Sequence, residues 1–331
     1  MFPLHRFSRR RAFQVAGALA STSLLRAQQR APGPPPHEHG PNVFLDYDQV
    51  ELDAEYDQFQ WAFNTKEIGR RTAQNSELAR QRLGNPMRVA YGDKDVEKMD
   101  IFRTQAANAP VHIFIHGGAW RRGSVKNLAY IAEPFVHAGV CVVLPDFNGV
   151  EELGGSLMAM EGQVRSAIAW VAKNAKSFGG DPNRIYLSGH SSGAHLSGCA
   201  LSADWPREYG LPADVIKGAV LVSGMYELKP VSLSGRSKYV KFDEATLENL
   251  SAQRHLDRIR VPVVVAHASL DTPEFQRQSR EFAAALKAAG KPVEFLVGEG
   301  YNHFEFIETL GNPYGILGAA AFRQMGLLAK I

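Results

Sequence analysis

A serine in a glycine-bounded turn is the residue of this chain with the clearest capacity for chemistry. Ser191 lies in Gly189-His190-Ser191-Ser192-Gly193, with an apolar run at 185–188 before it and a helix-like stretch at 194–201 after it. This order of strand, turn and helix is that of a nucleophile elbow, in which the serine occupies strained backbone and the glycines leave room for a tight turn. Because short Gly and Ser motifs also arise by chance, the interpretation depends on partners elsewhere in the chain.

Two such partners follow later strands in the expected order. A serine hydroxyl is a weak nucleophile, so it needs a neighbouring base and an acid that orients the base. Asp271 follows an apolar run at 261–266, and His303 follows another at 293–297. The order serine, acid, histidine accompanies a nucleophile elbow, and all three residues are expected at one rim of a parallel sheet. We predict Ser191 as nucleophile, His303 as general base and then acid, and Asp271 as the orienting carboxylate.

Other titratable residues compete for these roles. Glu274, three residues after Asp271, is the alternative acid, and Glu299 precedes His303 on the same loop. His190 adjoins the nucleophile, but its side chain is expected to point elsewhere, and it is a candidate for lining the substrate pocket. We interpret His195 and His267 as structural.

Backbone amides at two places are candidates for an oxyanion hole. Gly117 and Gly118, in the run His116-Gly117-Gly118-Ala119-Trp120, bring amides without side chains close to a reacting carbonyl. The N–H of Ser192, directly after the nucleophile, is the second source. Loss of one such donor typically costs ~3 kcal/mol of transition-state stabilisation. His116 is expected to support this loop, and Trp120 either walls the acyl pocket or packs beneath the loop.

The surrounding pattern predicts one α/β domain at 43–331. From residue 111 onward, buried strand-like runs alternate with helical stretches, which indicates a mostly parallel, doubly wound sheet flanked by helices. Strands are expected at 87–92, 98–103, 111–115, 140–144, 185–188, 219–222, 261–266 and 293–297, and helices at about 157–178, 194–201, 275–289 and 304–328. Residues 43–83 form a helical extension that is a candidate cap, with Tyr47, Tyr56 and Trp61 as core anchors or, alternatively, ligand contacts. Residues 225–257 form a polar insertion.

The first residues have the pattern of a targeting signal. Ser8-Arg9-Arg10-Arg11-Ala12-Phe13 precedes an apolar stretch at 15–25, which is shorter than the ~20 residues that a bilayer span needs. The pattern resembles a twin-arginine export signal, with Ala27 as a small residue at the cleavage site. We therefore predict a signal peptide at 1–27 and a bacterial periplasmic or secreted location; a basic arm is the alternative.

A proline-rich segment at 28–42 follows, and we expect it to be a linker that packs no core. His37 and His39 lie in it; they could bind a metal by accident, but we expect them to be solvated. No His or Cys spacing in the chain predicts a metal site, and nothing indicates a cofactor. Cys141 and Cys199 fall in predicted buried elements, which favours small core side chains over a disulfide.

The charge balance excludes one class of partner. The net charge is +3, but residues 1–27 hold five arginines and no acid, which leaves 32 basic against 34 acidic residues. The sequence contains no basic stripe of the kind that would indicate nucleic-acid binding. We expect a small-molecule ester or amide substrate and no stable membrane insertion; the oligomeric state stays open, and a dimer is compatible with the sequence.

Several stretches resemble a known family. His-Gly-Gly-x-Trp stands at 116–120 and Gly-His-Ser-x-Gly-Ala-His-Leu at 189–196, and further similar stretches stand at 222–230, 274–280 and 302–304. Over about residues 43–328 the chain resembles α/β-hydrolases of the kynurenine formamidase (arylformamidase) and hormone-sensitive-lipase-like esterase group. Ser192 stands where the group usually has Ala. The resemblance implies an α/β-hydrolase fold, a serine hydrolase that forms an acyl-enzyme, and an extension that helps to cover the site.

Three hypotheses follow. The first is a hydrolase of a carboxylic ester or an aryl amide such as N-formylkynurenine. The second is a broad exported carboxylesterase that acts on short acyl or aryl esters. The third is a non-catalytic binding protein on a hydrolase fold, against which the complete set of Ser191, Asp271 and His303 argues.

Overall fold

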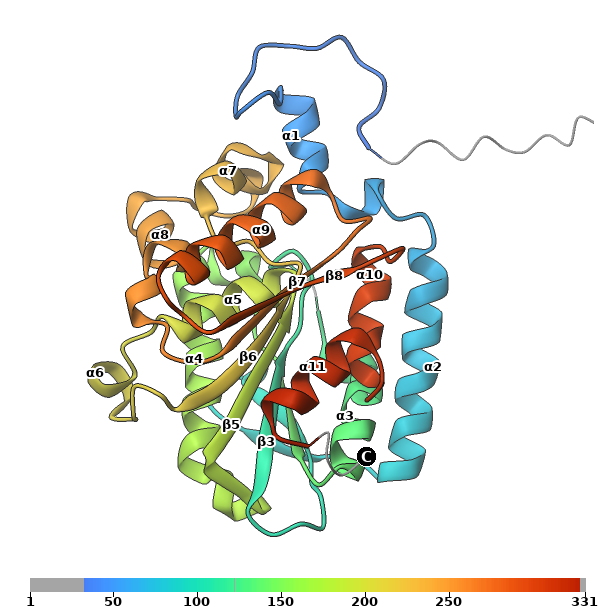
Figure 1. Ribbon diagram of the computed structural model, residues 1–331, viewed down its shortest axis with the longest axis vertical. Coiled ribbons are helices and arrows are strands. Elements are labelled where there is room, and N and C mark those ends of the chain that lie inside the picture. Colours follow the sequence, from blue (N-terminus) through green and yellow to red (C-terminus); the bar gives the residue numbers. More distant parts are fainter. Residues whose placement is uncertain (1–32, 122, 328–331) are drawn as a thin grey trace, which may run out of the picture. The chain divides into compact units, whose positions relative to one another are not determined.

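An eight-stranded sheet forms the centre of the structure (Figure 1). The computed structural model describes residues 33–121 and 123–327. The strands are β1 (Met87–Ala90), β2 (Lys98–Phe102), β3 (Ala109–Ile115), β4 (Cys141–Pro145), β5 (Gly180–His190), β6 (Ile216–Val222), β7 (Val263–Ala268) and β8 (Val293–Gly298), in the order β1-β2-β4-β3-β5-β6-β7-β8. β1 pairs with β2, and β2 with β4, in antiparallel fashion, while the other neighbours are parallel. The predicted mostly parallel α/β sheet is confirmed.

Helices connect the strands and precede them. The α-helices are α1 (Gln49–Glu55), α2 (Thr65–Leu83), α3 (Ala129–His137), α4 (Leu157–Asn174), α5 (Ser192–Leu201), α6 (Trp205–Tyr209), α7 (Leu228–Leu233), α8 (Glu244–Asn249), α9 (Pro273–Ala288), α10 (His303–Phe306) and α11 (Ile316–Gln324). Short 3₁₀ helices are η1 (Gln58–Gln60), η2 (Val125–Asn127), η3 (Val150–Leu153), η4 (Ala175–Phe178), η5 (Gly235–Lys238), η6 (Ala252–Arg254), η7 (Leu256–Arg258) and η8 (Ile307–Gly311). No helix within the described ranges is both long and apolar enough to span a bilayer.

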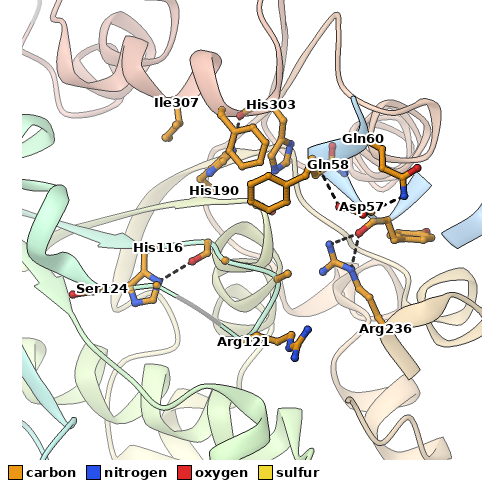
Figure 2. A pocket seen from close by; sticks show the side chains of 18 of the residues that line it. Asp57, Gln58, Gln60, His116, Arg121, Ser124, His190, Arg236, His303 and Ile307 are labelled. Atoms are coloured by element: carbon orange, nitrogen blue, oxygen red, sulfur yellow. Dashed lines mark hydrogen bonds between the residues drawn. The ribbon is translucent and has the colours of Figure 1, made fainter. Parts of the chain in front are cut away.

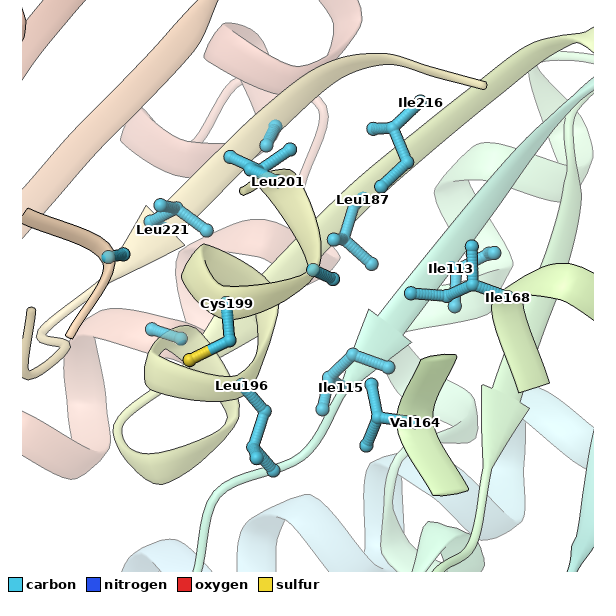
Figure 3. Packing of buried hydrophobic residues seen from close by; sticks show 14 of the residues in the cluster. Ile113, Ile115, Val164, Ile168, Leu187, Leu196, Cys199, Leu201, Ile216 and Leu221 are labelled. Carbon is cyan, nitrogen blue, oxygen red and sulfur yellow. The ribbon is translucent and has the colours of Figure 1, made fainter. Parts of the chain in front are cut away.

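Each face of the sheet carries its own apolar core. Side chains alternate across a strand, so neighbouring residues of β3 enter different cores. Ile113 and Ile115 pack on the face covered by α4 and α5, with Val164 among their neighbours in the cluster (Figure 3). Phe114 belongs to the opposite cluster with Phe135 of α3. Because each such side chain contributes roughly 1.5–3 kcal/mol when fully buried, the two cores hold the strand ends rigidly in place.

The C-terminal segment differs clearly from expectation. A single helix was predicted over 304–328, whereas the structure has α10, η8 and, after a break, α11. Pro313 lies in the break, and a proline disfavours helical backbone at the residue before it. A Cβ on Gly315 would come within 2.3 Å of the Thr309 carbonyl oxygen, so the chain turns closely back on itself here.

The extension before β1 divides into two parts. α2 packs along α3, while α1 contacts α9 and η5 (Figure 1). Arg236 of η5 donates to the carbonyl oxygen of Tyr56 from Nη2 at 3.1 Å and from Nε at 3.3 Å, which joins the insertion to the extension. The predicted signal peptide at 1–27 and the start of the linker, 28–32, lie outside the described residues.

Candidate active site

Ser191 occupies the sharp turn between β5 and α5. Its φ of 56° and ψ of −125° are strained values for a residue with a side chain, and its N–H donates to the Val222 carbonyl at 2.8 Å. A Cβ on Gly193 would lie 2.1 Å from the Ile115 carbonyl oxygen, and one on Gly189 would lie 2.4 Å from the Gly193 oxygen. The turn therefore requires glycine at both positions.

The structure brings His303 and Asp271 together at the same rim. Asp271 follows β7, and His303 opens α10 after β8. His303 Nδ1–H donates to Asp271 Oδ1 at 2.6 Å, and both side chains are buried. This bond leaves His303 Nε2 as the proton acceptor, and Ser191 and His303 line the same cavity. The geometry is that of a nucleophile with an oriented base.

Asp271 has two further hydrogen-bond partners on its other oxygen. The Ser223 hydroxyl donates to Oδ2 at 2.6 Å, and the Ala268 N–H donates to it at 2.9 Å. Burial raises the pKa of Asp271, but the charge and hydrogen bond of His303, with these two donors, outweigh burial and hold the pKa below its usual value. Asp271 is therefore ionised at neutral pH. The role of Ser223 was missed from the sequence, although it directly follows a strand in the formamidase-like stretch at 222–230.

Replacing Ser223 with alanine should lower kcat about 10-fold, because a hydrogen bond to a charged group is worth roughly 1.5 kcal/mol or more. The lost donor also leaves Asp271 less firmly oriented toward His303. Initial rates with p-nitrophenyl acetate test this, with thermal unfolding as the check on the fold. Parental kcat in the folded variant would show that Ser223 does not position Asp271.

The loop after β3 passes directly beside the nucleophile. Gly117 and Gly118 line the cavity with Ser191, and a Cβ on Gly117 would lie 2.7 Å from the His190 oxygen and 3.0 Å from Ser191 Cβ. The ring of His116 stacks on Phe147 at 4.3 Å, and its Nδ1–H donates to the Gly117 oxygen at 2.9 Å. Ser192 is the first residue of α5, where amides have no partner within the helix. Gly117 and Gly118 thus line the cavity beside Ser191, and Ser192 directly follows it; their role as an oxyanion hole stays a prediction.

Trp120 supports this loop from beneath. Its ring is buried, does not line the cavity, and donates from Nε1 to His195 Nδ1 at 3.2 Å. His195 in turn donates from Nε2 to the Leu250 oxygen at 2.9 Å, and burial lowers its pKa to about 4. Of the two alternatives, packing beneath the loop is what the structure shows, so the assignment of Trp120 to the substrate pocket is wrong.

His190 lines the cavity, as proposed from the sequence, and also contacts the base. Its Nε2–H donates to the His303 carbonyl oxygen at 2.9 Å, and the two rings lie 4.6 Å apart. Burial, aided by the nearby His303, lowers the pKa of His190 to about 3. A neutral imidazole here holds the backbone of His303 without competing for the proton.

The cavity above Ser191 has a volume of about 680 Å³, within the range of small-molecule sites. Three segments that are far apart in the sequence supply much of its wall. The extension contributes Asp53 and 56–60, the β3 loop contributes 116–119, and the insertion contributes Gly235, Arg236 and Tyr239. In Figure 2, Asp57, Gln60 and Arg236 lie on the opposite side from His116 and Ser124. Of the three aromatic residues that the sequence offered as possible ligand contacts, Tyr56 lines the cavity, and Tyr47 and Trp61 do not.

Glu274, the alternative acid, is occupied elsewhere. Arg277 donates to its two oxygens at 2.6 and 2.8 Å, and the Tyr56 hydroxyl donates to it at 2.9 Å. The Glu274 N–H donates to Glu55 Oε2 at 2.8 Å. Glu274 therefore anchors the extension to α9, while Asp271 contacts His303.

Replacing Glu55 with glutamine should stabilise the protein above pH 7. Burial, the largest cause, raises the pKa of Glu55 from 4.5 to about 7, while the acceptor for the Glu274 N–H is retained in glutamine. Below pH 4.5 the carboxyl is neutral in both folded and unfolded chains. Between pH 4.5 and 7 only the unfolded chain releases the proton, so stability falls as pH rises, by up to about 3 kcal/mol.

The check is urea unfolding of both proteins at pH 4 and pH 8. The advantage of the variant should appear at pH 8 and vanish at pH 4. Equal free-energy differences at both pH values would contradict the prediction.

Comparisons with known proteins agree with this geometry. A family profile described as BD-FAE matches residues 99–204. Kynurenine formamidase of Danio rerio is 33% identical over 258 residues, which cover 76% of this chain and 85% of that protein. The enzyme of the same name from Salmo salar is 32% identical over 279 residues, covering 80% and 92%. Among solved structures, a Thermogutta terrifontis esterase with butyrate bound superposes with a TM-score of 0.62 at 23% identity, covering 75% of this chain and 97% of that one.

The sheet order and the elbow at its rim define an α/β-hydrolase fold with the site of a serine hydrolase. The chain belongs to the arylformamidase- and esterase-like group of that superfamily, since its identity to the two formamidases extends over most of both proteins. Its chemistry is the hydrolysis of an ester or amide by an active serine.

Proposed function

We propose that the enzyme removes a short acyl group, such as formyl, from an aryl amine or phenol through a Ser191 acyl-enzyme. The observation that carries the proposal is the bond between His303 Nδ1 and Asp271 Oδ1, beside a strained Ser191 in the same cavity. The relatives named kynurenine formamidase support an aryl formamide, for example N-formylkynurenine, as the first substrate to test.

The residues divide the reaction between them. His303 Nε2 takes the Ser191 proton as Oγ attacks the carbonyl carbon. The amides of Gly117, Gly118 and Ser192 stabilise the oxyanion. His303 then returns the proton to the leaving nitrogen or oxygen, and the C–N or C–O bond breaks. A water molecule deprotonated by His303 attacks the acyl-enzyme, which releases the acid and restores Ser191.

The cavity walls support a polar leaving group. Asp53 and Asp57 provide carboxylates and Arg121 and Arg236 provide guanidinium groups, all lining one cavity. Groups of both signs suit an aromatic amine that carries an amino-acid side chain better than a long alkyl chain. Tyr239 is in cation–π contact with Arg121, at 4.6 Å from its ring centroid, and offers an aromatic surface beside them.

A second candidate is a broad carboxylesterase for short acyl or aryl esters. The observation in its favour is the apolar part of the cavity, formed by Phe114, Leu128, Tyr130 and Ile307. This lining offers room for acyl groups larger than formyl.

One substrate panel separates these candidates. Purified protein is assayed with N-formylkynurenine, p-nitrophenyl acetate and p-nitrophenyl butyrate, and a fluorophosphonate probe is used to label Ser191, with Ser191→Ala as the control. A higher kcat/KM for the formamide supports the first candidate, and a preference for butyrate supports the second. Neither labelling nor turnover of any substrate would favour a non-catalytic binding protein.

We also propose export through the twin-arginine pathway. The supporting observation is the sequence at 8–27, with its arginine run, short apolar stretch and small residue. Cell fractionation of a bacterial host expressing the full chain, with an Arg10→Lys/Arg11→Lys variant as comparison, should find activity in the periplasm for the parent and in the cytoplasm for the variant. Cytoplasmic activity of both would contradict export.

A further inference from the structure

Four side chains with metal-binding atoms meet where the segment before α1 turns back onto that helix. They are His37, His39, Asp48 and Glu51, and one donor atom from each lies within 4.8 Å of the others. Both histidines are exposed, as expected for a linker, and each also contacts a carboxylate. His37 Nε2 lies 2.9 Å from Asp48 Oδ2, and His39 Nδ1 lies 3.2 Å from Glu51 Oε2 and 3.7 Å from Asp48 Oδ2.

In each imidazole, the nitrogen that faces away from the carboxylates lies within hydrogen-bond distance of an acceptor oxygen. His37 Nδ1 lies 3.0 Å from the Pro35 carbonyl oxygen, which can only accept, so this nitrogen carries the proton. His39 Nε2 lies 3.0 Å from Asn42 Oδ1, and the Asn42 amide is oriented by its own donation to the Leu45 oxygen at 3.2 Å. In a neutral imidazole the other nitrogen is then an unprotonated lone pair. Both lone pairs face the two carboxylates.

Carboxylates in contact with the imidazoles are balanced in one of two ways: the imidazoles are protonated and form ion pairs, or they are neutral and a cation lies among the donors. One divalent ion would balance the charges of Asp48 and Glu51 and use both imidazole lone pairs. A tetrahedral site with bonds of about 2.0–2.1 Å places its donors about 3.3 Å apart. The three distances of 2.9, 3.2 and 3.7 Å bracket that separation.

Backbone hydrogen bonds hold the two carboxylates in place. Metal ligands in proteins are commonly oriented by such additional hydrogen bonds. Asp48 Oδ2 accepts from the Gly40 N–H at 2.7 Å, and Asp48 Oδ1 accepts from the Glu51 N–H at 2.9 Å. Glu51 Oε2 accepts from the Asp48 N–H at 3.0 Å. The Asp48 side chain is 4% exposed and that of His39 is 49% exposed, so an ion would enter from the His39 side.

We propose that His37, His39, Asp48 and Glu51 form a site for a zinc-class divalent ion. Two imidazoles with two carboxylates suit Zn²⁺, whereas Ca²⁺ and Mg²⁺ prefer sites made of oxygen alone. The bound ion ties residues 37–42 to α1. Since the chain continues from α1 into Tyr56 and η1, which line the cavity, the ion also secures one wall of the active site.

The test is Zn²⁺ titration of the full chain by calorimetry after chelator treatment and dialysis, with thermal unfolding in parallel. The parent should bind one Zn²⁺ per chain, and Zn²⁺ should raise its melting temperature. The His37→Ala/His39→Ala variant should bind at least about 100-fold more weakly, since loss of an outer-shell partner alone can cost that much. His137→Ala, which removes an exposed histidine of α3 outside the cluster, should bind as the parent does.

Asp48→Asn separates ligation from helix capping. Asparagine still accepts the N-cap hydrogen bond that Asp48 provides to α1, but it lacks the charge. This variant should retain its fold and lose Zn²⁺ affinity. The proposal is overturned if the parent binds no Zn²⁺, if Ca²⁺ binds more tightly, or if the double histidine variant keeps parental affinity. In the first case the cluster is a set of ion pairs with protonated imidazoles.

Discussion

Replacing Ser191 with alanine should lower kcat about 10⁵- to 10⁶-fold while leaving the protein folded. The hydroxyl is the only atom group removed, so no acyl-enzyme forms and His303 has no nucleophile to deprotonate. The amides of Gly117, Gly118 and Ser192 stay in place, and the slow residual reaction would be direct attack by water. Initial rates with p-nitrophenyl acetate and N-formylkynurenine measure the loss.

Two controls accompany this variant. Its melting temperature should equal or exceed that of the parent, because alanine removes a buried hydroxyl at a strained position without adding volume. Fluorophosphonate labelling should disappear. Turnover within 10-fold of the parent would refute Ser191 as nucleophile and direct attention to another group in the cavity.

Replacing Asp271 with asparagine should lower kcat about 10⁴-fold at neutral pH. The Ser223 hydroxyl and the Ala268 N–H both donate to Oδ2, so the amide oxygen of asparagine would take that position. Its NH₂ group would then point at His303 Nδ1. Histidine would respond by placing its proton on Nε2, where the base must be free.

A second substitution at the same position separates the effect of the His303 tautomer from the effect of the lost charge. Asp271→Asn and Asp271→Ala both remove the charge, but only asparagine imposes the wrong tautomer on His303. We therefore expect alanine to be no worse than asparagine in kcat, although it leaves the Ser223 hydroxyl without its acceptor. Higher activity for asparagine than for alanine would indicate that charge and packing, rather than the tautomer, determine the effect. Rates of both variants with p-nitrophenyl acetate decide between these outcomes.

Much of this fold could be predicted because parallel strands buried on both faces are continuous apolar runs. Val111–Ile115 and 219–222 have this pattern, and each was assigned correctly. The predicted helix over 304–328 failed because apolar spacing continues across Gly311 to Gly315, where proline and glycines break the backbone. The periodicity of the apolar residues alone does not reveal such a break in the helix.

The reacting residues of the site could be predicted from the sequence, whereas the contacts that form its walls could not. Ser191, Asp271 and His303 each follow a strand, so their meeting follows from the topology of a parallel sheet. Arg236 and Tyr56 meet across 180 positions of sequence through irregular segments, and no local pattern predicts that contact. The cluster around His37 likewise depends on a turn that brings Pro35 to Gly40 back to Asp48.

The origin of the cavity walls has a consequence for how new specificities arise. Residues 53–60 precede the first strand and belong to one short continuous stretch, while the reacting groups lie on loops after β3, β5, β7 and β8. Exchange of that stretch between related genes would alter one wall of the cavity and leave the reacting groups on their own loops. Libraries randomised at Asp57, Gln58 and Gln60 would sample the same change in the laboratory.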